Sequence, residues 1–140
     1  RIECNERVSI MRIDGPLSGG GNTDRPWRDT IAVNMSGGGL CAHTPELWNS
    51  GERIVLRIPF LKSIGVSATL IAICCRCFEN HGRCYAGAEF IRRSELSRHF
   101  SESELKLLPD GCDRFDHHHQ NRLVNYVFQQ QIELRKKGLL

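Results

Sequence analysis

Alternating apolar and polar residues recur along the chain between positions 7 and 91. Successive side chains of a β-strand point to opposite faces, so this period of two predicts strands that are buried on one face. We predict strands at residues 7–13, 30–35, 40–43, 52–60, 66–78 and 83–91. Turns rich in glycine and polar residues separate them, without a helical pattern in between. The arrangement predicts an antiparallel β-barrel or sandwich.

The connections between these strands carry turn chemistry. Residues 14–29 hold a dense run of Gly, Pro, Asn and Asp, which predicts a long, mobile loop. Residues 79–82, Glu-Asn-His-Gly, predict a hairpin turn between the last two strands. Short connections of this kind favour neighbouring antiparallel strands.

Helical patterns replace the alternation after the last strand. Ser94 and Ser101 are polar residues of the kind that begin helices, and they predict the starts of two short helices. Residues 116–137 form the longest helical pattern, with Asp116 at its start and a basic end that suits the helix dipole. Its apolar positions, which predict one broad packing face, are Leu123, Val124, Val127, Phe128, Ile132 and Leu134.

The 140 residues suffice for one domain with an appended helix. We place a barrel at residues 1–108, and a linker with a helix packed on the barrel at 109–140. The net charge of +3, from 19 basic and 16 acidic residues, would attract a phosphate-bearing ligand but is too small for a duplex-DNA binder.

No apolar run approaches the roughly 18 residues that span a bilayer. A secretion signal is also missing from the sequence, so its seven cysteines predict reduced thiols in a cytoplasmic protein. The first residue is Arg1 rather than Met, which suggests a fragment of a longer chain.

The most distinctive chemistry lies at residues 34–40, Asn-Met-Ser-Gly-Gly-Gly-Leu. Glycine adopts positive φ and lacks the Cβ that would keep a ligand away from the backbone. Asn34 and Ser36 add short hydrogen-bonding side chains, which suit a nucleobase edge or a phosphate. A glycine-rich turn without a ligand is the alternative on residue types alone.

This segment carries a family resemblance. Asn34-x-Ser36-x-x-Gly39, between two predicted strands, resembles the (Asp/Asn)-x-Ser-x-x-Gly signature of PilZ domains. Gly87-Ala-Glu-Phe-Ile91 resembles the Gly-x-x-Phe closing strand of that family, and the likeness covers residues 1–100. It implies an all-β fold, a six-stranded antiparallel PilZ-type β-barrel with a C-terminal amphipathic α-helix.

The resemblance implies binding of cyclic di-GMP, without a further cofactor and without catalysis. The residues that it assigns to this ligand are Arg1, Asn34, Ser36, Gly37, Gly38 and Gly39. The first PilZ signature, Arg-x-x-x-Arg, binds guanine and phosphate through forked guanidinium groups, and only its second arginine is matched here, by Arg1. Either the chain is cut within that signature, or this relative lacks the first arginine and binds more weakly, by about 1–3 kcal/mol. The arginine segment is expected to order over the nucleotide.

The last helix extends the resemblance. Residues 121–137 are similar to the terminal helix of the flagellar-brake (YcgR-like) subgroup of PilZ proteins. This likeness implies a protein partner in the flagellar motor, either its stator or its rotor switch. A PilZ-like adaptor that binds no nucleotide and acts by protein contact alone is the alternative.

Other residues permit rival interpretations. A zinc site is one, with candidate ligands Cys74, Cys77, His81 and Cys84. Strand alternation, however, predicts that Cys74 faces away from Cys77, and buried thiols that act as small apolar groups are commoner. Ser36 and His43 are the nearest approach to a catalytic pair, but they lack the strand–turn–helix setting of a nucleophile. Trp48 is expected to pack in the core.

Overall fold

The computed structural model of the chain describes residues 1–13 and 26–139. Its strands are β1 (Ile2–Ile13), β2 (Arg28–Met35), β3 (Gly39–Thr44), β4 (Arg53–Arg57), β5 (Thr69–Asn80) and β6 (Arg83–Ile91). Its helical segments are the 3-10 helices η2 (Pro59–Ile64) and η3 (Arg93–Arg98), and the α-helices α1 (Glu102–Leu105) and α2 (His117–Lys136). Most of the predicted loop at 14–29 lies outside the described residues.

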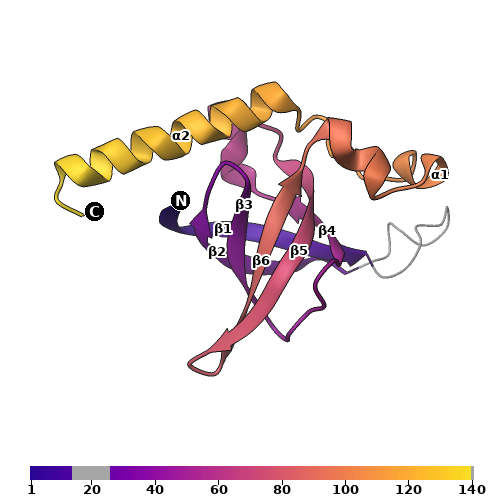
Figure 1. Cartoon of the computed structure of the whole chain (residues 1–140), viewed down its shortest axis with the longest axis horizontal. Helices are drawn as coiled ribbons and strands as arrows, with labels where there is room; N and C mark the ends of the chain where they lie inside the picture. Colours follow the sequence, from indigo (N-terminus) through magenta and orange to yellow (C-terminus); the bar gives the residue numbers. More distant parts are fainter. Residues whose placement is uncertain (14–25, 140) are drawn as a thin grey trace.

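The six strands close into one barrel in the order β1, β2, β3, β6, β5, β4, and each neighbouring pair is antiparallel. The predicted six-stranded antiparallel barrel with a C-terminal helix is therefore confirmed. Figure 1 shows α2 running across one end of the barrel, close to the N-terminus, while the β5–β6 hairpin projects at the other end.

The ends of several strands differ from the prediction, and for two of these strands the cause is clear. Alternation extended the fourth strand through Pro59, but β4 stops at Arg57 and Pro59 opens η2. Proline lacks the N–H that a sheet requires, and its fixed φ suits the first turn of a helix. β1 begins earlier than predicted, at Ile2, because a bulge between Glu3 and Glu6 interrupts the alternation there.

The barrel interior is filled by one face of every strand. Its largest fully buried side chains include Met35, Ile54, Leu56 and Leu70. Phe115, from the segment before α2, packs edge-on against Phe90 with ring centroids 5.7 Å apart. Burial of each such side chain contributes about 1.5–3 kcal/mol, so this core fixes the strands on which the functional surface lies.

Helix α2 packs on the barrel through a narrower face than predicted. Leu123 and Val127 are buried, whereas Val124 is 46% and Phe128 57% exposed, so the prediction that all of these form one packing face is wrong. Adjacent residues of a helix lie about 100° apart, and the docked position of α2 turns the row of Leu123 and Val127 toward the core, while Val124 lies beside Gly37 at its edge. No helix in the described part of the chain is long and apolar enough to cross a membrane.

Candidate functional site

The turn between β2 and β3 is held by its own hydrogen bonds. The backbone N–H of Ser36 donates to the Gly39 carbonyl at 2.8 Å, which closes the turn. The Ser36 hydroxyl donates to the same carbonyl at 3.4 Å and accepts from the Gly38 N–H at 3.3 Å. Ser36 therefore sets the shape of the turn.

The three glycines of this turn have different surroundings. A Cβ at Gly37 would overlap Cγ2 of Val124 on α2, and a Cβ at Gly39 would overlap the Ala88 carbonyl of β6. A Cβ at Gly38 would meet no atom within 4 Å. Gly37 thus lets the helix approach, Gly39 lets β3 and β6 approach, and Gly38 faces open space.

A pocket of about 310 Å³ opens beside the turn. Five of the six residues that the sequence assigns to a ligand line it, namely Arg1, Asn34, Ser36, Gly38 and Gly39. The sixth, Gly37, lies against α2 instead and is not part of the lining. A larger pocket, of about 590 Å³, lies between η3 and the segment before α2, but none of the predicted site residues reaches it. The smaller pocket is therefore the candidate site.

Strand pairing explains why the surface is hollow at this point. Across the outer face of the barrel, Asn34 pairs with Cys41, Cys41 with Gly87, and Gly87 with Arg76. Side chains of residues paired in this way stand on the same face of the sheet. Because Gly87 has none, the row is interrupted, and the gap forms the floor of the pocket.

Charged side chains surround this floor. Arg1 and Arg76 supply two guanidinium groups and Glu89 one carboxylate. Burial raises the pKa of the Cys41 thiol, and the positive charges of Arg1 and Arg76 act on it in the opposite direction. Neither arginine forms an ion pair with another described residue. The excess of positive charge suits an anionic ligand.

Asn34 contributes a hydrogen-bond acceptor without a donor. Its Oδ1 atom is buried and accepts no hydrogen bond from any residue that the structure describes. Most buried polar atoms are paired, and an unpaired one costs about 1–3 kcal/mol. Because Asn34 itself lines the pocket, its unpaired acceptor fits a site in which a ligand supplies the donor once the side chain turns toward it.

Comparison with known families agrees with this arrangement. The profile of the PilZ domain matches residues 1–103, a span that contains the whole barrel and every residue of the pocket. The chain belongs to the PilZ domain family. PilZ domains are binding and adaptor domains rather than enzymes. No curated protein sequence matches the chain.

Among solved structures, this chain resembles the Bacillus subtilis inhibitor of motility MotI/DgrA, with a TM-score of 0.57 and 17% sequence identity. The match covers 96% of this chain and 50% of that one, so the chain spans half of the neighbour's length. At this identity, the likeness supports the PilZ fold that strand order and pairing already show.

Sequence reasoning did not assign several residues that line the PilZ pocket, among them Arg76 and Phe78 on β5 and Glu89 on β6. For Arg76 and Phe78 the reason is a β-bulge, because the pairing of β5 with β6 shifts by one residue between Cys74 and Arg76. Strict alternation would turn Arg76 and Phe78 inward, and the extra residue returns them to the outer face. An arginine inside an otherwise apolar run was the available clue.

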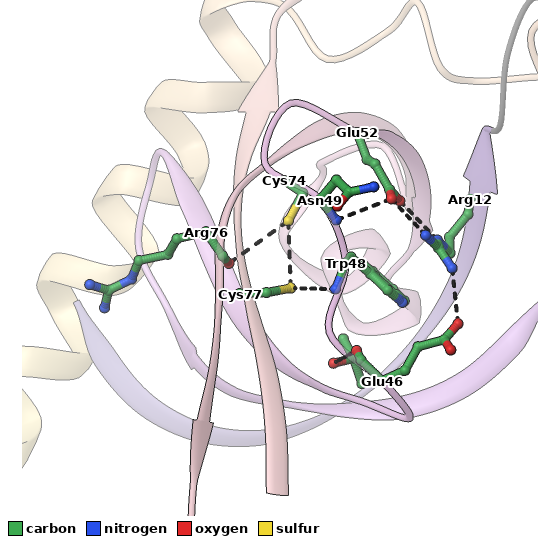
Figure 2. A network of polar contacts seen from close by, with 9 residues as sticks. Arg12, Glu46, Trp48, Asn49, Glu52, Cys74, Arg76 and Cys77 are labelled. Atoms are coloured by element: carbon green, nitrogen blue, oxygen red, sulfur yellow. Dashed lines mark hydrogen bonds and ion pairs between the residues drawn. The ribbon is translucent and has the colours of Figure 1, made fainter.

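The same bulge corrects the prediction about the cysteines. Cys74 and Cys77 do not face apart, since their sulfur atoms lie 3.9 Å from each other (Figure 2). The Cys77 sulfur also accepts the backbone N–H of Trp48 at 3.1 Å. No group of three or more His, Cys, Asp or Glu residues in the described ranges is arranged to hold a metal ion. These thiols pack beside the core and fix the segment before β4, where Trp48 is buried as predicted.

Proposed function

We propose that this PilZ domain binds cyclic di-GMP in the pocket beside the β2–β3 turn and relays the level of this second messenger to a protein partner. The observation that carries the proposal is the convergence of Arg1 with Asn34, Ser36, Gly38 and Gly39 on one hollow of the barrel. Arg1 and the turn at 34–39, which are far apart in the sequence, line the same pocket.

The donors and acceptors of the pocket match a guanine nucleotide. The unpaired Oδ1 of Asn34 suits the N–H groups of a guanine edge. The Arg1 guanidinium suits guanine O6 and N7 or a phosphate, to which it donates in forked geometry. Gly38 leaves room for a ligand to approach the backbone of the turn.

A route from ligand to partner runs through α2, which contacts Arg1 in the pocket and Gly37 in the turn beside it. The Gln131 side chain donates to the Arg1 carbonyl at 3.1 Å, and Val124 packs against Gly37. Ordering of the Arg1 segment over a nucleotide would change the surface around this helix, including exposed Phe128. We propose the flagellar motor stator or rotor switch as the partner, which accords with the structural neighbour being an inhibitor of motility.

Calorimetric titration of the chain with cyclic di-GMP tests the proposal. We expect saturable binding, weakened about tenfold in Asn34→Ala and in Ser36→Ala, which corresponds to roughly 1.4 kcal/mol for each lost interaction. Asn125→Ala, an exposed asparagine of α2 outside the pocket, is the matched control and should bind like the wild type. Absence of binding by the wild-type chain would favour the adaptor that acts by protein contact alone.

A further inference from the structure

The β-bulge in β5 turns the Arg76 side chain to the outer face of the barrel, whereas a regular strand would turn it inward. Cys74 pairs with Ala88 and Arg76 with Gly87, so Cys75 is the inserted residue. Without the insertion, Arg76 would point into the apolar barrel. Bulges that redirect a side chain are common next to functional sites. Here the redirected side chain is exposed and lines the pocket beside the motif turn.

An aromatic row supports the Arg76 guanidinium. Its Cζ atom lies 5.1 Å from the centroid of the Phe78 ring. Phe78 stacks on Tyr85 of β6, with ring centroids 5.4 Å apart and an angle of 15° between the ring planes. The Tyr85 ring in turn lies beside the His43 ring of β3, with centroids 4.5 Å apart. Because this row crosses three paired strands, the ring beneath Arg76 is held in place by the sheet.

The donors of Arg76 are available to a ligand. Its guanidinium forms no ion pair with a described residue, although the carboxylate of Glu89 lines the same pocket. A guanidinium plane with one face on an aromatic ring can stack its other face on a base, and its edge N–H groups stay free to donate. Arg1, the residue before β1, lines the same pocket.

We propose that Arg76 is a ligand-contacting residue outside the two PilZ signatures, which stacks on a guanine base of the bound nucleotide, and that Phe78 is the positioning residue beneath it. The inference rests on the proposed function and adds the second cation of the site. Arg1, just before β1, and Arg76 on β5 then bind the nucleotide together over the gap at Gly87.

Titration of variants with cyclic di-GMP tests this role. We expect Arg76→Ala to bind about tenfold more weakly, within the roughly 5–150-fold range of a specific arginine–base contact. Arg76→Lys should recover only part of the loss, because lysine keeps the charge but neither the fork nor the flat stacking surface. Arg83→Ala, which removes an exposed arginine of the same hairpin outside the pocket, should bind like the wild type.

The role of Phe78 needs a readout that a purely structural role would leave unchanged. Phe78→Leu should weaken binding about threefold alone and should have no further effect in an Arg76→Ala background, since it acts through Arg76. Wild-type affinity in Arg76→Ala, together with loss in Asn34→Ala and Ser36→Ala, would overturn this inference and leave the proposed function standing. Absence of binding by the wild-type chain would overturn both.

Discussion

Two arginines in this barrel lie over aromatic rings at the same separation and have opposite surroundings. Arg12 lies 5.1 Å from the centroid of Trp48, and Arg76 lies 5.1 Å from that of Phe78. Arg12 donates to both carboxylate oxygens of Glu52, at 2.8 and 2.6 Å, and to Glu46 at 3.1 Å. Arg76 has no such partner among the described residues. Occupied donors mark a structural arginine, and free donors mark one that can bind a ligand.

Figure 2 shows the difference directly. The Arg12 guanidinium turns toward Glu52 and Glu46, whereas the Arg76 guanidinium points away from this network. Glu52 also accepts the backbone N–H of Asn49 at 3.1 Å, so the network joins β1 to the segment before β4. One region of the barrel is thus closed by paired charges, and the other is left open by unpaired ones.

Arg12→Ala should have the largest effect and should change stability alone. It removes the bidentate pair and leaves Glu52, whose side chain is 14% exposed, without its main partner. We expect the free energy of unfolding in urea to fall by about 2–3 kcal/mol. Arg76→Ala should leave it unchanged within about 0.5 kcal/mol.

The binding measurements should reverse that order. Folded Arg12→Ala should retain wild-type affinity for cyclic di-GMP, whereas Arg76→Ala loses affinity. If both variants lose stability equally, the distinction between the two arginines is wrong.

The sequence predicts those features of the structure that depend on residues close together in the chain, and it fails for those that depend on distant ones. The strands and the 34–39 turn depend on neighbours in sequence, and alternation and the PilZ signature identified both. The outward turn of Arg76 depends on how β5 pairs with β6, and strict alternation within β5 predicts the opposite direction. The exposure of Val124 and Phe128 likewise depends on the row by which α2 docks. Long-range pairing and docking thus account for the errors.

The glycines of the turn offer the next sharpest contrast. A side chain at Gly39 would collide with the Ala88 carbonyl of the partner strand, which cannot move without parting β3 from β6. We expect Gly39→Ala to lower the free energy of unfolding by about 2 kcal/mol. Gly38→Ala, with open space around it, should keep wild-type stability and weaken cyclic di-GMP binding. Equal unfolding midpoints for the two variants would refute this assignment.

Gly37 tests the contact between the turn and α2. A methyl group there overlaps the Val124 side chain, which can shift more easily than backbone. Gly37→Ala should therefore destabilise by about 1 kcal/mol. Val124→Ala should relieve the overlap, so the double variant should be more stable than Gly37→Ala alone, by urea unfolding. Additive losses in the double-mutant cycle would show that the two residues do not interact.

The smallest expected effect is a dependence of stability on pH. Hydrogen bonds from Arg12 hold the pKa of Glu52 below its ordinary value of 4.5, against the opposing effect of burial. The unfolded chain therefore binds this proton more readily than the folded chain, and the stabilisation is present above pH 4.5 and lost as pH falls through the lowered pKa. The loss should be smaller than in Arg12→Ala, because Arg12 remains stacked on Trp48 and a protonated Glu52 still accepts a hydrogen bond.

Urea unfolding between about pH 6 and pH 3 should give a shallower slope of the unfolding free energy against pH for Glu52→Gln than for the wild type. Glu46→Gln, whose side chain is 66% exposed, should keep the wild-type slope. Equal slopes for Glu52→Gln and the wild type would mean that the Arg12 network does not depend on the charge of Glu52, and the contrast with Arg76 would then rest on hydrogen-bond geometry alone.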